Sequence, residues 1–143
     1  MNIKKLVVGQ TGIIPSGELD ILLSTVGKML SKKYEPLNHR EINATAALVL
    51  SKLGHKTIKL VTGTVSKNNE DPVGHTWILY SGMVLDFAHK RFWETKKKTY
   101  TFGMIQEYIP LKSIPFRNKS VNRELAQDIY KEIKSNIFWR TLR

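Results

Sequence analysis

One hairpin signal constrains the fold more than any other part of the chain. Within residues 74–87, two runs rich in β-branched and aromatic residues flank Ser81-Gly82, a pattern typical of a tight β-hairpin. With this dipeptide as the turn, His75 lies diagonally from Asp86 on the same face of the ribbon. The register therefore predicts an imidazole beside a carboxylate. Such a carboxylate fixes the imidazole tautomer and leaves the second ring nitrogen free for chemistry.

Three other segments carry apolar residues at helical spacing. The first follows Ser16, and the second follows Asn38 and stops at Gly54. Asn38, with a glutamate three residues later, has the spacing of a capping box. The third segment begins near Ser120 or Asn122 and is basic towards its end. These patterns predict three amphipathic helices.

Two more segments have the composition of strands. Residues 57–65 are rich in β-branched side chains, and Gly63 within them marks a bulge or a close backbone approach. Residues 100–108 are predicted to add a strand that ends before Pro110. Together with the hairpin, these strands predict an antiparallel sheet. The whole chain, 1–143, is predicted to form one α+β domain with helices packed on that sheet and a basic helix at the C-terminal end.

The composition limits the chemistry and the partners. The chain has no cysteine, which excludes disulfides, thiolate metal sites and a cysteine nucleophile. A net charge of +11, from 23 basic and 12 acidic residues, favours an anionic partner, most often nucleic acid. The alternative is a basic surface that only keeps the protein dissolved. No apolar run approaches the length of a membrane span or of a signal-peptide core, so a cytoplasmic protein without membrane contact is predicted.

The segment after the hairpin interleaves basic and aromatic side chains. Lysine and arginine there would bind phosphates, and the rings would stack on bases. The alternative is a solvated loop that its aromatic residues anchor to the core. The predicted nucleic-acid-binding residues are Arg40, Lys90, Arg91, Trp93, Lys96, Lys97 and Lys98.

Three motifs between residues 37 and 90 occur in an order known from one group of proteins. A helix ends in Leu-Gly, a strand ends at a glycine, and the hairpin reads Gly-His-Thr-Trp before its turn and Val-Leu-Asp after it. This pattern resembles the transglutaminase-like branch of the papain-like cysteine peptidase superfamily, and it implies a papain/transglutaminase-like core. In that family a cysteine at the helix start attacks a carbonyl, a histidine activates it and an aspartate orients the histidine. The resemblance implies the last two roles for His75 and Asp86.

No residue of this chain can take the first role, that of the cysteine nucleophile. Counted back from the Leu-Gly pair, the family's cysteine falls near His39 or Arg40, and neither side chain can act as a thiol. Thiol peptidase and transglutaminase chemistry is therefore excluded, and no cofactor is predicted. A metal site made of His39, His75 and Asp86 lacks the short ligand spacing of known sites.

Three interpretations stay open. In the first, the domain is a former enzyme that binds nucleic acid or another polyanion, and His75 with Asp86 is a structural pair. In the second, His39 and His75 are the acid and base of a metal-independent ribonuclease-type hydrolase, with a nearby cation to stabilise the phosphorane. In the third, the chain is an inhibitor or interaction module that binds a protein partner.

Overall fold

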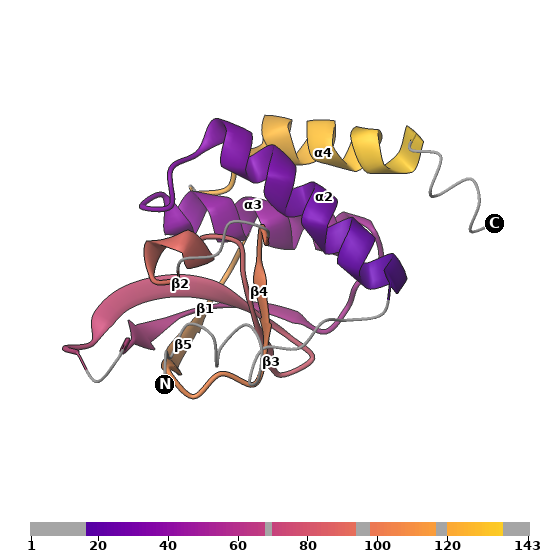
Figure 1. The fold of residues 1–143 in the computed structure, drawn as a ribbon. Coiled ribbons are helices and arrows are strands. Elements are labelled where there is room, and N and C mark those ends of the chain that lie inside the picture. The colour runs from indigo at the N-terminus through magenta and orange to yellow at the C-terminus, as the bar shows by residue number, and fades with distance from the viewer. Residues whose placement is uncertain (1–16, 68–69, 94–97, 117–119, 136–143) are drawn as a thin grey trace.

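The structure is a computed structural model that describes residues 17–67, 70–93, 98–116 and 120–135. Residues 3–8 are an apolar run that the sequence assigns either to a first strand or to an ordered arm. These residues and the predicted site residues Lys96 and Lys97 lie outside the described ranges. In chain order, the elements are α2 (Gly17–Lys33), α3 (His39–Lys52), β1 (Ile58–Val65), β2 (Val73–Tyr80), β3 (Met83–Asp86), the single 3-10 turn η2 (His89–Arg91), β4 (Thr101–Gly103), β5 (Tyr108–Ile114) and α4 (Arg123–Ser135) (Figure 1).

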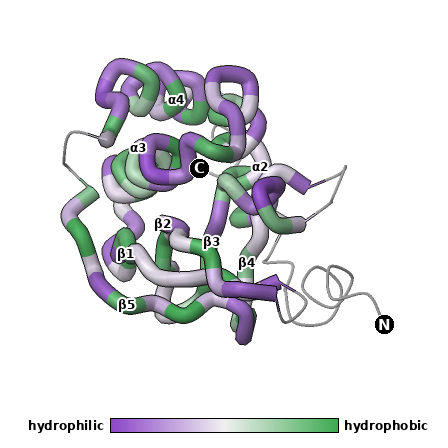
Figure 2. The backbone as a smooth tube through the Cα atoms, turned by 90° about the vertical axis from the view of Figure 1, so that its left-hand side faces the viewer, coloured by the Kyte–Doolittle hydropathy of each residue, from purple (hydrophilic) through white to green (hydrophobic). Residues whose placement is uncertain are grey.

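The helices form a layer on one face of a five-stranded sheet. The strand order is β4-β3-β2-β1-β5, and every neighbouring pair is antiparallel. The central helix α3 packs on β1 and β2, and α2 and α4 pack on α3 (Figure 2). The predicted α+β architecture, with helices on an antiparallel sheet, is confirmed.

Apolar side chains fill both faces of the sheet. The main core lies between the helices and the sheet, and α3 contributes an unbroken buried run from Ile42 to Leu50. A second, smaller cluster contains Val61, Val65, Trp77, Val84, Phe92, Trp93, Ile105 and Tyr108. Because this cluster includes residues that follow η2 and residues near β5, the chain after the hairpin is tied to the sheet.

The hairpin has the predicted register. Tyr80 pairs with Met83 and Leu79 with Val84, around a turn in which Ser81 and Gly82 have φ values of 50° and 83°. Two positive φ values in succession are those of the turn that best matches strand twist. The hairpin prediction is confirmed.

Gly63 marks both features that its position in a strand predicted. The register between β1 and β5 shifts between Thr62 and Gly63, which is a bulge. A Cβ atom added at Gly63 would lie 2.1 Å from the backbone oxygen of Ile109. Any larger residue at this position would therefore push the edge strand β5 away.

Two local predictions are wrong. Residues 100–108 are not one strand: β4 ends at Gly103, and β5 begins at Tyr108 and continues through Pro110. Proline is tolerated there because β5 is an edge strand, which needs hydrogen bonds on one side only. The Asn38 side chain makes no capping hydrogen bond, whereas Asn122 Oδ1 does accept one from the Leu125 N–H, at 2.9 Å.

The helices of the described ranges are too short or too polar to cross a membrane.

Candidate functional site

Strands β2 and β3 bring His75 and Asp86 together, as the hairpin register predicts. The Nε2 atom of His75 lies 2.8 Å from Oδ2 of Asp86, and neither side chain is exposed. Because side chains alternate along a strand, His75 shares a face of the sheet with Trp77, and the two rings are stacked with centroids 6.1 Å apart. An imidazole and a carboxylate at the observed distance form a charge-assisted hydrogen bond.

The Asp86 carboxylate accepts three further hydrogen bonds. Tyr108 OH donates at 2.7 Å, the Ala88 N–H at 2.8 Å and Asn43 Nδ2 at 3.0 Å. Burial alone would raise the pKa of this carboxyl, but the interaction with His75 and the hydrogen bonds from Tyr108 and Asn43 outweigh burial and hold the pKa below its usual range. Asp86 is therefore an ionised, fully hydrogen-bonded group inside the domain.

Asn43 and Tyr108 were not identified from the sequence. Asn43 lies one helical turn after His39 on α3, and it links the helix to the hairpin: its Nδ2 donates to the Thr76 carbonyl at 2.8 Å, and its Oδ1 accepts the Phe87 N–H at 3.0 Å. An asparagine inside an otherwise apolar helix face was the available signal. For Tyr108 there was none, because β5 reaches the site from a distant part of the chain.

His39, the first residue of α3, lies against His75. The two ring centroids are 4.8 Å apart, and the Thr76 N–H donates to Nδ1 of His39 at 3.1 Å. Burial, then the electrostatic influence of the adjoining His75 ring and the positive charge of Arg91, lower the pKa of His39 to about 4. At neutral pH His39 is therefore uncharged, and its proton is on Nε2 because Nδ1 accepts a hydrogen bond.

Arg91, in η2, contacts the ring nitrogen of His75 that does not face Asp86. Its guanidinium donates to His75 Nδ1 at 3.1 Å and to the Gly74 carbonyl at 2.8 Å. A guanidinium has no acceptor, so His75 Nδ1 must be the acceptor, and the ring proton is on Nε2 facing Asp86. The expectation that the second ring nitrogen is free for chemistry is wrong, because Arg91 occupies it.

The remaining predicted nucleic-acid-binding residues differ in their exposure to solvent and in their ion pairs. Lys90 and Arg40 are exposed. Lys98 Nζ lies 3.9 Å from an Asp20 carboxylate oxygen. The structure brings Arg91 and the first turn of α3, where Arg40 lies, to the same end of the helix layer, but it places Lys98 near α2.

Trp93 is fully buried. Its Nε1–H donates to Tyr108 OH at 3.1 Å, and its ring belongs to the smaller apolar cluster. A ring that is fully buried and lines no pocket of the described part of the chain has no face to offer a base. The expected stacking role of Trp93 is therefore corrected: its burial favours the alternative in which the aromatic residues anchor this segment to the core.

Within the described part of the chain, no group of three or more histidine, aspartate or glutamate side chains is placed to hold a metal ion.

Comparisons with known proteins give no further assignment. No family model, no curated protein and no solved structure matches this chain. Any function must therefore be inferred from the fold, the charge and the buried cluster around His75 and Asp86.

Two histidines make stability depend on pH. His39 and His89 both have pKa values near 4, mainly because burial disfavours their charged forms, whereas an unfolded histidine titrates near 6.5. Between these values the unfolded chain binds protons that the folded chain does not. Stability is therefore lost as the pH falls from about 6.5 to about 4.

We expect a melting temperature that is constant between pH 7 and 8 and falls steadily below pH 6.5. His89 is the more deeply buried of the two. The difference between its pKa values in the folded and unfolded chain corresponds to a loss of about 3 kcal/mol at most in the free energy of unfolding. Thermal unfolding followed by circular dichroism at several pH values measures this. The His89→Gln variant should show a flatter profile than the wild type, and a wild-type melting temperature that stays constant down to pH 4.5 would contradict the pKa assignment.

Proposed function

We propose that this chain is a non-thiol domain of the papain/transglutaminase-like class, which binds nucleic acid or another polyanion without cleaving it. The order of elements supports the class: a central helix starts at His39, the next hairpin carries His75, and Asp86 follows the turn. His39 stands at the helix start, where the cysteine of that class would lie. The absence of cysteine rules out thiol chemistry.

The observation that carries the proposal is that neither imidazole has a free lone pair. Nδ1 of His75 accepts from Arg91, and Nδ1 of His39 accepts from the Thr76 N–H. A general base needs a lone pair within reach of the substrate proton. His75 is also only 1% exposed. This arrangement supports a structural role for the pair of His75 and Asp86.

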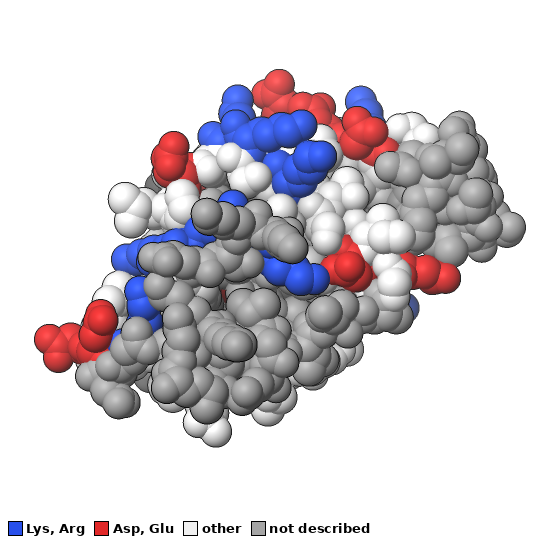
Figure 3. All heavy atoms as spheres, viewed as in Figure 1, with Lys and Arg blue, Asp and Glu red and all other residues white. Residues whose placement is uncertain are grey.

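The partner is inferred from the charge. The net charge of +11 exceeds what solubility requires of a small domain. Figure 3 shows Lys and Arg side chains grouped over the region of α2 and α4, with a second group lower on the same face. Exposed lysines include Lys32 and Lys33, in the last turn of α2, and Lys90. Cations spread over a surface suit a repeating anion such as a phosphate backbone.

One geometric feature favours a second candidate, the ribonuclease-type hydrolase. The rings of His39 and His75 lie 4.8 Å apart with the Arg91 guanidinium beside them, which are the groups that such chemistry uses. This function requires Arg91 to leave His75 Nδ1 so that a substrate can reach it. RNA cleavage that is lost in the His75→Gln variant would support it over binding alone.

Removal of basic side chains after the hairpin tests the binding proposal. We expect the Lys96→Gln/Lys97→Gln/Lys98→Gln variant to bind single-stranded RNA more weakly. The plot of log affinity against log salt should be shallower by about 2, since each lost phosphate contact removes about 0.7 from the slope. Fluorescence anisotropy over a range of salt concentrations measures both quantities.

The matched control makes the same charge change at the far end of α3 and the start of β1: Lys52→Gln, Lys56→Gln and Lys59→Gln. This control should retain more affinity and a steeper slope than the first variant. Equal effects of the two triple variants would remove the segment after the hairpin from the binding surface.

A further inference from the structure

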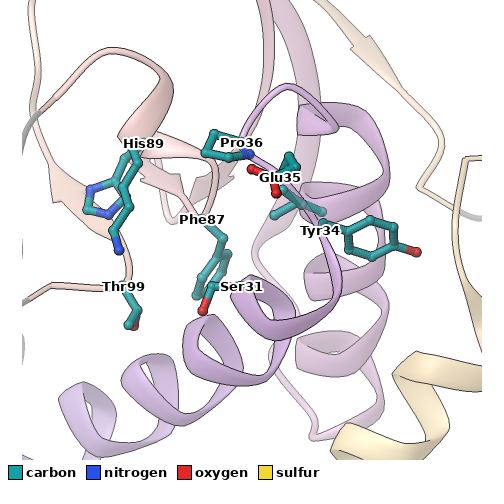
Figure 4. Close-up of a pocket in the computed structure, with 9 residues that line it drawn as sticks. Ser31, Tyr34, Glu35, Pro36, Phe87, His89 and Thr99 are labelled. Carbon is teal, nitrogen blue, oxygen red and sulfur yellow. The ribbon is translucent and has the colours of Figure 1, made fainter.

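A small pocket lies beside the buried cluster, between the C-terminal end of α2, the loop before α3, and η2 (Figure 4). Its volume is about 190 Å³, which is below the 300–1,000 Å³ typical of sites for drug-sized ligands. A cavity of this size suits a single ring system. None of the residues His39, His75, Asp86 and Arg91 lines it, so the pocket is separate from the histidine site.

The apolar part of the pocket wall comes from three different elements. Phe87 follows β3, Pro36 lies in the loop before α3, and Ile42 lies in the first turns of α3. Figure 4 shows Phe87 and Pro36 on different sides of the space. An aromatic ring and a proline ring are surfaces on which a flat heterocycle packs well.

The polar part of the wall offers acceptors. The Ser31 hydroxyl already donates to the Lys28 carbonyl at 3.0 Å, and the Thr99 hydroxyl donates to the Ser24 carbonyl at 3.2 Å. Each hydroxyl oxygen can therefore only accept a further hydrogen bond.

Glu35 adds the strongest acceptor. No described residue forms a hydrogen bond or an ion pair with its carboxylate, although the chain contains 23 lysines and arginines. In Figure 4 the Glu35 side chain extends from the loop before α3 toward the side where Phe87 and His89 lie. A flat ligand that meets the exposed Glu35 carboxylate and the two hydroxyl oxygens therefore presents N–H donors on that edge, whereas His89 and Lys90 place nitrogen atoms elsewhere along the wall.

We propose that the pocket binds the guanine base of a single-stranded nucleic acid, an inference that rests on the proposed polyanion-binding function. Guanine presents two adjacent donors, N1–H and the exocyclic amino group, which match the two oxygens of the Glu35 carboxylate. Adenine and cytosine present a ring-nitrogen acceptor beside their amino group, and uracil places a carbonyl on each side of its single N–H. All three would direct lone pairs at the carboxylate, which is unfavourable.

Lys90 is placed to bind the backbone of a nucleic-acid strand whose base occupies the pocket. Its exposed side chain lines the rim, where an ammonium group can bind the phosphate next to the inserted base. Phosphate contacts position a strand, and contacts to base edges give specificity. Glu35 would therefore set the base preference, and Lys90 would add affinity for every sequence.

Two RNA octamers that differ only in a central G or A test the proposal with the full-length chain. We expect the octamer with G to bind about tenfold more tightly, in the range of one good bidentate base contact. The Glu35→Gln variant should lose this preference. Because that substitution removes a negative charge, affinity for the octamer with A should stay the same or rise. Glu70→Gln, an exposed acid outside the pocket, makes the same charge change and should keep the preference.

The possible results separate the pocket from the general function. Equal, salt-sensitive binding of both octamers by the wild type would overturn the guanine pocket and leave polyanion binding intact. A preference for G that survives in the Glu35→Gln variant would also overturn it. If neither octamer binds at low salt, the polyanion-binding function itself fails, and the pocket proposal fails with it.

Discussion

The His39→Cys variant is expected to carry a thiol that ionises at least about one pH unit below the thiol of an Arg40→Cys variant. Both positions lie in the first turn of α3, so the helix dipole acts on both thiols. The side chain at position 39 also adjoins the His75 ring and lies near Arg91. The Arg91 guanidinium and the helix N-terminus favour a thiolate, and we expect them to outweigh the partial burial of position 39, which disfavours it.

The measurement is the pH dependence of alkylation by iodoacetamide. The wild-type chain has no cysteine, so each variant carries a single thiol and the unmodified protein is a blank. The midpoint of the rate profile reports the thiol pKa. Equal midpoints for the two variants would contradict the proposal that position 39 occupies the nucleophile position of a papain/transglutaminase-like site.

The second large effect is expected from the Asp86→Ala substitution, with a loss of about 3–5 kcal/mol in the free energy of unfolding. The substitution removes the acceptor for His75 Nε2–H, Tyr108 OH and Asn43 Nδ2 at once. Buried donors without a partner are costly, because water cannot reach them. Such a loss is a large part of the stability of most domains of this size.

Urea unfolding measures this loss, with the Asp71→Ala variant of an exposed acid as the matched control. Asp71→Ala should stay within about 0.5 kcal/mol of the wild type. If Asp86→Ala does not fold, the isosteric Asp86→Asn variant, which keeps one acceptor oxygen, should fold with an intermediate loss. An Asp86→Ala variant as stable as the wild type would show that the cluster does not hold the hairpin to α3.

The part of the site that could be predicted from the sequence is local. His75 and Asp86 lie on one hairpin, and a two-residue turn sets their register without reference to the rest of the fold. The helices were also predictable, because their apolar spacing and a C-terminal glycine are visible over short stretches.

The other parts of the site depend on contacts between distant segments. Tyr108 reaches Asp86 from β5, and β5 was missed because Pro110 indicated the end of a strand. Arg91 reaches His75 only because η2 turns the chain back toward the start of β2. No spacing rule predicts such a return. The sequence therefore predicted a His75 ring with a free second nitrogen, whereas in the structure that nitrogen, Nδ1, accepts a hydrogen bond from Arg91.

Trp93 illustrates the same limit for the binding surface. Basic residues around an aromatic ring are typical of a nucleic-acid contact, but the same pattern arises where a ring anchors a basic loop. Burial decides between the two, and burial of Trp93 depends on the smaller cluster that Val61 and Tyr108 form with it.

One measurement tests the central claim most directly. The wild-type chain is mixed with labelled single-stranded RNA and DNA over a range of salt concentrations, without added metal, and both mobility shift and cleavage are read from the same gel. We predict a shift that weakens steeply with salt and strands that stay intact. RNA cleavage that disappears in the His75→Gln variant would contradict the claim that Arg91 and Thr76 hold the two histidines in a structural role, and the absence of any shift at low salt would contradict the polyanion-binding function.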